Sequence, residues 1–137
     1  MSDTALIECL LGPDREGIRL IAVSTLHGSA TIDGTSGPMG NDTDAELLAA
    51  LREWADIAVV GSATVKAEEY GPSTSTRLAV LSHSLEFAGF EDFIAAGPIV
   101  LTPAERASSP EAQRLADAGA EVISTGTGTM SEAIACL

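Results

Sequence analysis

Residues 57–69, IAVVGSATVKAEE, contain the pattern on which the predicted fold depends. The run 57–60 is short and almost continuously apolar, as is typical of a strand covered on both faces. Gly61 ends this run, and a short helix is predicted to follow Thr64 and to end before Gly71. A buried strand, a tight turn and a helix form the unit from which parallel α/β sheets are built.

Four further short apolar runs share this character, and helical patterns separate most of them. The runs are residues 18–23, 78–81, 99–101 and 122–123. Strands that alternate with helices predict an α/β fold, a mostly parallel sheet with flanking helices and right-handed crossovers.

The helix predicted over 44–55 has the clearest sequence signals. Thr43 and Glu46 form a T-x-x-E capping box at its start. Its leucines and Trp54 recur on one face, and Arg52 lies off that face.

Two more helices are predicted in the second half of the chain. Ser109 and Pro110 suit the start of a helix over 110–118, and Gly119 suits its end. A further helix is expected to begin near Thr129 or Ser131.

The chain is predicted to consist of a leader, residues 1–16, and one α/β domain, residues 17–137. Gly12-Pro13 ends the leader's apolar stretch, and the glycines of segment 28–40 indicate a short arm and a long loop. The chain ends within an apolar helical pattern, so we expect a truncated domain whose C-terminal strands are missing.

The net charge of −13 argues against binding to nucleic acid or to anionic membranes, because both require cations. No apolar run approaches the ~20 residues of a membrane helix, and the first residues lack the features of a signal peptide. We therefore expect a soluble, cytoplasmic protein.

The turn at residues 61–68 is the strongest candidate for a binding site. Helix N-termini attract anions, and a glycine lets a ligand approach the main chain. The turn matches neither the G-x-G-x-x-G motif nor the P-loop motif. An alternative interpretation is a purely structural turn between strand and helix, with Ser62 or Thr64 as the helix cap. Segment 126–129, GTGT, also resembles a phosphate loop, although a simple connection between strand and helix is favoured.

Metal and nucleophile chemistry have little support in the sequence. No G-x-S-x-G elbow occurs. His27 and His83 lack carboxylates or cysteines at metal-binding spacing, so no metal site is predicted.

Five stretches together resemble the first part of the riboflavin-biosynthesis pyrimidine reductase family, the reductase half of bifunctional deaminase–reductases and their stand-alone relatives. They are AVSTLHG (22–28), GTSG (34–37), LREWAD (51–56), VVGSATVKAEEYGP (59–72) and RLAVLS (77–82). The resemblance covers residues 19–137 and implies a dihydrofolate-reductase-like fold.

The resemblance also implies an NADPH-dependent oxidoreductase, which reduces the ribosyl group of a phosphorylated aminopyrimidine to ribityl. Cofactor contacts are expected at Gly61, from the turn itself, and at the family positions Ala22, Pro38, Thr64, Glu68 and Ser82. Substrate contacts are expected at Ser36 and Arg52, whose guanidinium could hold the substrate phosphate. No catalytic residue is assigned, and a homodimer is one possible assembly.

Three departures from the family pattern leave alternatives open. His27 replaces the usual Asp of the family pattern. His83 replaces a common Arg, so NADH is an alternative to NADPH as the cofactor. The family's Glu-Gly-Gly segment does not occur, and the fragment alone is expected to have little activity. The alternatives are a non-catalytic nucleotide-binding or assembly module on the same fold, or a small nucleotide-binding α/β protein complete at this length.

Overall fold

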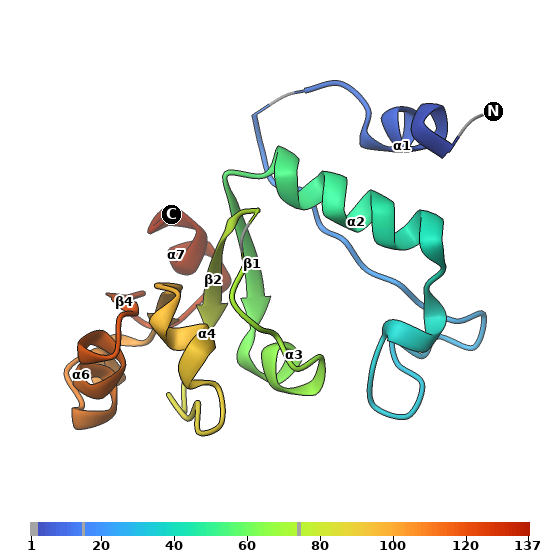
Figure 1. The fold of residues 1–137 in the computed structure, drawn as a ribbon. Coiled ribbons are helices and arrows are strands. Elements are labelled where there is room, and N and C mark those ends of the chain that lie inside the picture. Colours follow the sequence, from blue (N-terminus) through green and yellow to red (C-terminus); the bar gives the residue numbers. More distant parts are fainter. Residues whose placement is uncertain (1–2, 15, 74) are drawn as a thin grey trace. The chain divides into compact units, whose positions relative to one another are not determined.

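The computed structural model describes residues 3–14, 16–73 and 75–137. The chain divides into two compact units, Met1–Ala55 and Asp56–Leu137. Figure 1 shows the elements of each unit, and the two are described separately below.

The second unit is built on a four-stranded parallel sheet. Its strands are β1 (Ile57–Gly61), β2 (Arg77–Leu81), β3 (Ile99–Thr102) and β4 (Glu121–Ser124), in the order β1-β2-β3-β4. Figure 1 shows β1 and β2 side by side and pointing the same way. The sheet confirms the predicted α/β class and four of the five predicted strands.

Both faces of the sheet are covered, which explains the continuous apolar runs. Leu78 and Val80 of β2 enter one core cluster, whereas Ala79 between them enters the other. The helices of this unit are α3 (Ser62–Ala67), α4 (Glu91–Ala95), α5 (Ala104–Ala107), α6 (Pro110–Asp117) and α7 (Met130–Ala135). Helices α3, α4 and α6 supply buried residues to the first cluster, and α7 supplies Ala133 to the second.

The predicted boundaries of α6 and the predicted start of α7 are confirmed. The Ser109 hydroxyl accepts a hydrogen bond from the Ala112 amide at 3.2 Å, and Pro110 occupies the first turn. Gly119, with φ of +119°, follows the last turn. Thr129 caps α7 through a capping box with Glu132.

The first unit contains α1 (Asp3–Leu11), the short 3₁₀ helix η1 (Gly37–Met39) and α2 (Asp42–Trp54). The predicted capping box at Thr43 is wrong, because Asn41 caps α2 through a 2.9 Å hydrogen bond from the Asp44 amide. Asparagine is at least as good a cap as threonine, so the helix begins earlier and includes Thr43 in its first turn.

The predicted strand over 18–23 is also wrong. This segment forms no ladder, and Ile18 and Leu20 are 73% and 93% exposed. Within the described part of this unit, the one strand-like pairing is an isolated bridge between Ile32 and Thr35. An apolar run makes strand formation favourable, but it forms a strand only where a neighbouring strand is available.

The indole of Trp54 connects α2 to the segment after α1. Its Nε1 donates a hydrogen bond to the Asp14 carboxylate at 2.8 Å, and the Arg19 guanidinium stacks 4.0 Å from the ring centre. Arg19 also donates hydrogen bonds to the carbonyls of Leu11 and Pro13. No helix in the described ranges is both long and apolar enough to cross a bilayer.

Thr102, at the end of β3, generates a prediction about stability. It is fully buried, and its Oγ1 has no hydrogen-bond partner within the described residues. Thr102→Val removes a buried unsatisfied hydroxyl at almost constant volume, so we expect the free energy of unfolding to rise by about 1 kcal/mol in urea titrations.

The reverse change provides the control for Thr102. Val100, also fully buried on β3, gains an unpaired hydroxyl in Val100→Thr, which should lower the free energy of unfolding by about 1–3 kcal/mol. A Thr102→Val variant that is as destabilised as Val100→Thr would show that the Thr102 hydroxyl has a stabilising partner.

Candidate functional site

The carboxyl ends of the four strands lie at one edge of the sheet. Gly61 is paired with Leu81, Leu81 with Leu101, and Thr102 with Ser124, so the strands end at nearly the same level. The segments that follow them, 62–64, 82–84, 103–106 and 125–129, therefore gather at this edge, which we call the carboxyl edge. Ligands of open parallel sheets generally bind outside such an edge.

The turn after β1 leaves its main chain accessible. Gly61 is extended (φ −79°, ψ 148°) and precedes α3 without a side-chain cap, so the alternative of a cap at Ser62 or Thr64 is wrong. A Cβ placed on Gly61 would meet no atom within 4 Å. Thr64 is exposed in the first turn of α3. The main chain of this turn is therefore accessible, and the predicted cofactor contacts at Gly61 and Thr64 stay predictions.

Glu68 lies at the opposite end of the same short helix. It terminates α3, and its amide donates a hydrogen bond to the Thr64 carbonyl at 2.9 Å. The predicted contact residues Thr64 and Glu68 are thus separated by one helical turn.

Ser82 follows β2 and shapes the next turn of the carboxyl edge. It is buried, and its hydroxyl accepts a hydrogen bond from the Leu85 amide at 3.1 Å. This bond holds Leu85 in a left-handed conformation, with φ of +59°. Ser82 therefore has a structural role here, and its predicted contact with a cofactor ribose stays a prediction.

The same turn carries a cation that the sequence patterns did not single out. Arg106 of α5 donates hydrogen bonds to the carbonyls of His83, at 3.2 Å from Nε, and of Ser84, at 3.4 Å from Nη2. His83 is also 3.2 Å from the carboxylate of Glu105. These contacts join residues more than 20 positions apart, and no local motif encodes them.

The loop after β4 is filled by a carboxylate of the chain itself. Glu132 accepts hydrogen bonds from the Thr127 hydroxyl at 2.7 Å and the Thr129 hydroxyl at 2.8 Å. The amides of Thr127 and Thr129 donate to the same carboxylate at 3.3 and 3.0 Å. The GTGT segment is therefore a strand-to-helix connection, as favoured from the sequence, and the amides and hydroxyls of both its threonines donate to Glu132.

The remaining predicted site residues belong to the first unit. Ser36 precedes η1 and Pro38 lies within it, whereas Arg52 is in the last turn of α2. Ala22 is exposed and lines an open groove of about 580 Å³, together with residues 10–13, 18–21 and Leu51. The structure thus places Ser36 beside Pro38, and Gly61 and Thr64 at the same edge as Ser82.

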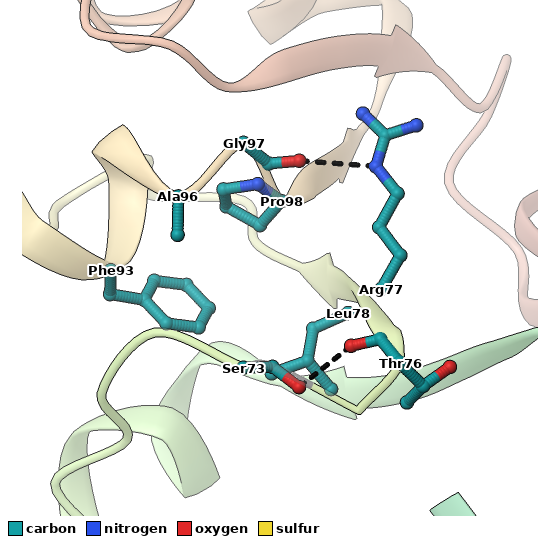
Figure 2. Close-up of a pocket in the computed structure, with 8 residues that line it drawn as sticks. All are labelled: Ser73, Thr76, Arg77, Leu78, Phe93, Ala96, Gly97 and Pro98. Carbon is teal, nitrogen blue, oxygen red and sulfur yellow. Dashed lines mark hydrogen bonds between the residues drawn. The ribbon is translucent and has the colours of Figure 1, made fainter. Parts of the chain in front are cut away.

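A small depression at the opposite, amino edge of the sheet is not a competing site. Figure 2 shows it beside the hydrogen bond from Arg77 Nε to the Gly97 carbonyl, 3.1 Å long. Its volume of about 30 Å³ is that of a single water molecule. It is too small for a nucleotide or a sugar phosphate.

Comparison with solved structures identifies a similar protein. A pyrimidine reductase-like protein from Corynebacterium diphtheriae is 36% identical, with a TM-score of 0.69 over 84% of this chain. The chain spans 57% of the length of that protein. No protein-family model and no curated protein matches the chain. The similarity supports the predicted dihydrofolate-reductase-like fold.

The loop after β4 generates a prediction about pH. Hydrogen bonds, above all from the Thr127 hydroxyl and then from Thr129, lower the pKa of Glu132 from 4.5 to about 2. A carboxyl with a lowered folded-state pKa stabilises the fold above the unfolded-state pKa, and this contribution is lost as the pH falls from about 4.5 to about 2. At pH 7 we therefore expect Glu132→Gln to lower Tm, and the difference from the parent protein to shrink across that pH range.

Glu86→Gln, which changes an exposed carboxylate outside the loop, is the matched control and should leave Tm nearly unchanged. Equal effects of the two substitutions on Tm at pH 7 would contradict the stabilising role of the Glu132 contacts.

Proposed function

We propose that this chain carries part of a reductase of the pyrimidine reductase type, which uses NADPH to reduce a ribosylated aminopyrimidine phosphate in riboflavin biosynthesis. The similarity to the C. diphtheriae protein is the observation that carries this proposal. The Gly61 turn at the carboxyl edge supports it independently, because a ligand phosphate can approach the uncovered main chain there.

In this proposal, the chain's residues bind and orient two phosphorylated molecules. The main chain at Gly61 and the exposed Thr64 face the cofactor's pyrophosphate. Arg52 and Ser36 hold the substrate phosphate, where the planar guanidinium can donate two parallel hydrogen bonds. The remaining cofactor contacts are proposed at Ala22, Pro38, Glu68 and Ser82.

The proposed role of the protein is to position the cofactor against the substrate, and its side chains need not take part in the redox step. A bound reduced nicotinamide would supply a hydride to the ribosyl carbon and water would supply the accompanying proton, while the protein holds donor and acceptor in contact. The proposed partners are therefore a small phosphorylated pyrimidine and a nicotinamide dinucleotide, at a cytoplasmic location.

A second candidate function, assembly without catalysis, is favoured by unpaired strand surfaces. β1 is an end strand of the four-stranded sheet, and its Val59 is 43% exposed. The apolar segment 18–26 is largely exposed in the first unit. The exposed edge of β1 can pair with a strand of another copy of the chain, and the apolar side chains of segment 18–26 add exposed surface for such a contact.

Gly61 offers a direct test of the dinucleotide site. Gly61→Ala adds a methyl group where the free protein has open space and ordinary backbone angles, so folding should be unaffected. The methyl should nevertheless obstruct a phosphate at the main chain, and we expect the Kd for NADPH, measured by calorimetry, to rise about tenfold or more, which corresponds to about 1.4 kcal/mol.

Gly71→Ala is the matched control, since a Cβ there also meets no atom within 4 Å and Gly71 does not have a positive φ. It should bind NADPH as the parent chain does. A parent chain without affinity for NADPH, or a Gly61→Ala variant with unchanged affinity, would overturn the proposed site.

Sedimentation distinguishes the assembly candidate. Strand pairing through exposed edges predicts a monomer–oligomer equilibrium that shifts with protein concentration, and Val59→Lys on the end strand should shift it toward the monomer. A monomer at all concentrations would exclude edge-driven assembly.

A further inference from the structure

We propose that Asp33-Gly34 is a self-modifying site, at which the chain forms a succinimide ring and then isoaspartate without the help of an enzyme. It is the single Asp-Gly pair of the sequence, and it lies in the exposed loop before η1. The inference goes beyond the proposed function, because it concerns a covalent change of the main chain. The conformation and the accessibility of the pair carry it.

Asp33 and Gly34 are the two central residues of a tight turn. The Ile32 amide donates a hydrogen bond to the Thr35 carbonyl at 2.9 Å, and the Thr35 amide donates one to the Ile32 carbonyl at 3.2 Å. Both central residues have a positive φ, +51° at Asp33 and +88° at Gly34. This is the pattern of a type I′ turn, for which Asp-Gly is a preferred sequence. The turn therefore explains why this pair of residues occurs here.

The two reacting groups, the Asp33 carboxyl and the Gly34 amide, are adjacent and accessible. Both residues are exposed. Among the described residues, none donates a hydrogen bond to the Asp33 carboxylate and none accepts one from the Gly34 amide. Gly34 has no Cβ beside its nitrogen, and a Cβ built there would meet no atom within 4 Å. Neither a side chain nor a neighbouring segment therefore obstructs the pair.

The reaction is intramolecular and involves no oxidation or reduction. The Gly34 nitrogen forms a bond to Cγ of Asp33, and the hydroxyl of the protonated carboxyl group leaves as water with the amide proton. Water then opens the ring at one of its two carbonyl carbons. Attack at Cγ restores aspartate, whereas attack at the main-chain carbonyl carbon breaks the original peptide bond and leaves isoaspartate, whose main chain passes through Cβ. Groups held on adjacent residues react far more readily than separate molecules.

The fold restrains this turn only weakly. The bridge between Ile32 and Thr35 is isolated, and no ladder continues it within the described residues. Ile32 itself is 42% exposed. A turn held by two hydrogen bonds and little buried surface opens locally at a small fraction of the free energy of global unfolding. The carboxyl group can therefore rotate toward the amide while the rest of the first unit stays folded.

Isoaspartate would alter a segment to which the proposed function assigns binding, and this consequence rests on that function. The extra main-chain carbon is incompatible with a two-residue turn that requires positive φ at consecutive residues. Ser36 and Pro38, the proposed contacts of substrate and cofactor, follow the turn directly. Chains that carry isoaspartate should therefore lose affinity for NADPH, measured by calorimetry.

Water labelled with heavy oxygen provides the test, because each passage through the succinimide incorporates one heavy oxygen atom. The folded parent chain would be incubated in this water at neutral pH and digested, and peptide fragmentation would assign the label. We expect Asp33 to gain about tenfold or more label than Asp42, an exposed aspartate of the same unit whose neighbour Thr43 has a branched side chain beside the amide. Chromatography should resolve an isoaspartyl form of the labelled peptide.

Two variants and a peptide separate the contributions of chemistry and fold. Asp33→Asn should gain label faster, because ammonia leaves in place of water, and asparagine also tolerates a positive φ. Asp33→Glu should gain almost none, since its ring would have six members and forms far more slowly. A synthetic peptide of residues 29–37 measures the reactivity of the sequence without the fold. Labelling of the folded chain should be within about tenfold of that of the peptide, because local opening has a small cost.

Two outcomes would overturn the modification site: a folded parent chain that stays unlabelled at Asp33 while the peptide becomes labelled, or equal labelling of Asp33 and Asp42. The proposed function fails separately. Fresh parent chain without affinity for NADPH would reject that function and leave the labelling result unaffected. Aged chains that contain isoaspartate and bind NADPH as fresh chains do would reject only the consequence for binding.

Discussion

Burial of the two central strands on both faces is the constraint on which the rest of the second unit depends. Fully burying one large aliphatic side chain contributes about 1.5–3 kcal/mol, and β2 and β3 bury Leu78, Val80, Ile99, Val100 and Leu101. A strand of this kind is stable only where helices cover both faces of its sheet. Helical crossovers connect successive strands that point the same way, so every connecting turn after a strand falls at the same edge. The position of the candidate site is thus a consequence of core packing.

The turns at the carboxyl edge differ in which main-chain and side-chain groups they leave accessible to a ligand. The turn after β1 has open space at Gly61. Next to it, the turn after β2 is held by Ser82 and carries Arg106 at its surface. The loop after β4 is occupied by the carboxylate of Glu132, although its glycines and threonines resemble a phosphate loop. Accessible main chain and an oriented cation therefore occur at neighbouring turns on one side of the edge.

The strands of the sheet could be predicted from the sequence, because a strand that is buried on both faces needs apolar residues at nearly every position. The same pattern failed at residues 18–23, since hydrophobicity shows that a segment can pair and does not show with what. Local signals placed α6 and α7 correctly, whereas Thr43 was a plausible cap that Asn41 displaced. The Gly61 turn could be found from its strand–glycine–helix pattern. Arg106 could not, because it contacts main-chain carbonyls of a distant segment, and no motif describes such contacts.

Trp54 has a practical consequence for physical study of this protein. It is the single tryptophan of the chain, and its indole is fixed by Asp14 and Arg19, which belong to the same unit. Tryptophan fluorescence, excited where Tyr70 does not absorb, therefore reports on the first unit, whereas circular dichroism is sensitive to helices and strands in both units. Denaturation curves from the two methods coincide only if both units unfold in one cooperative transition. The chain thus contains its own optical probe of whether its two units are thermodynamically independent.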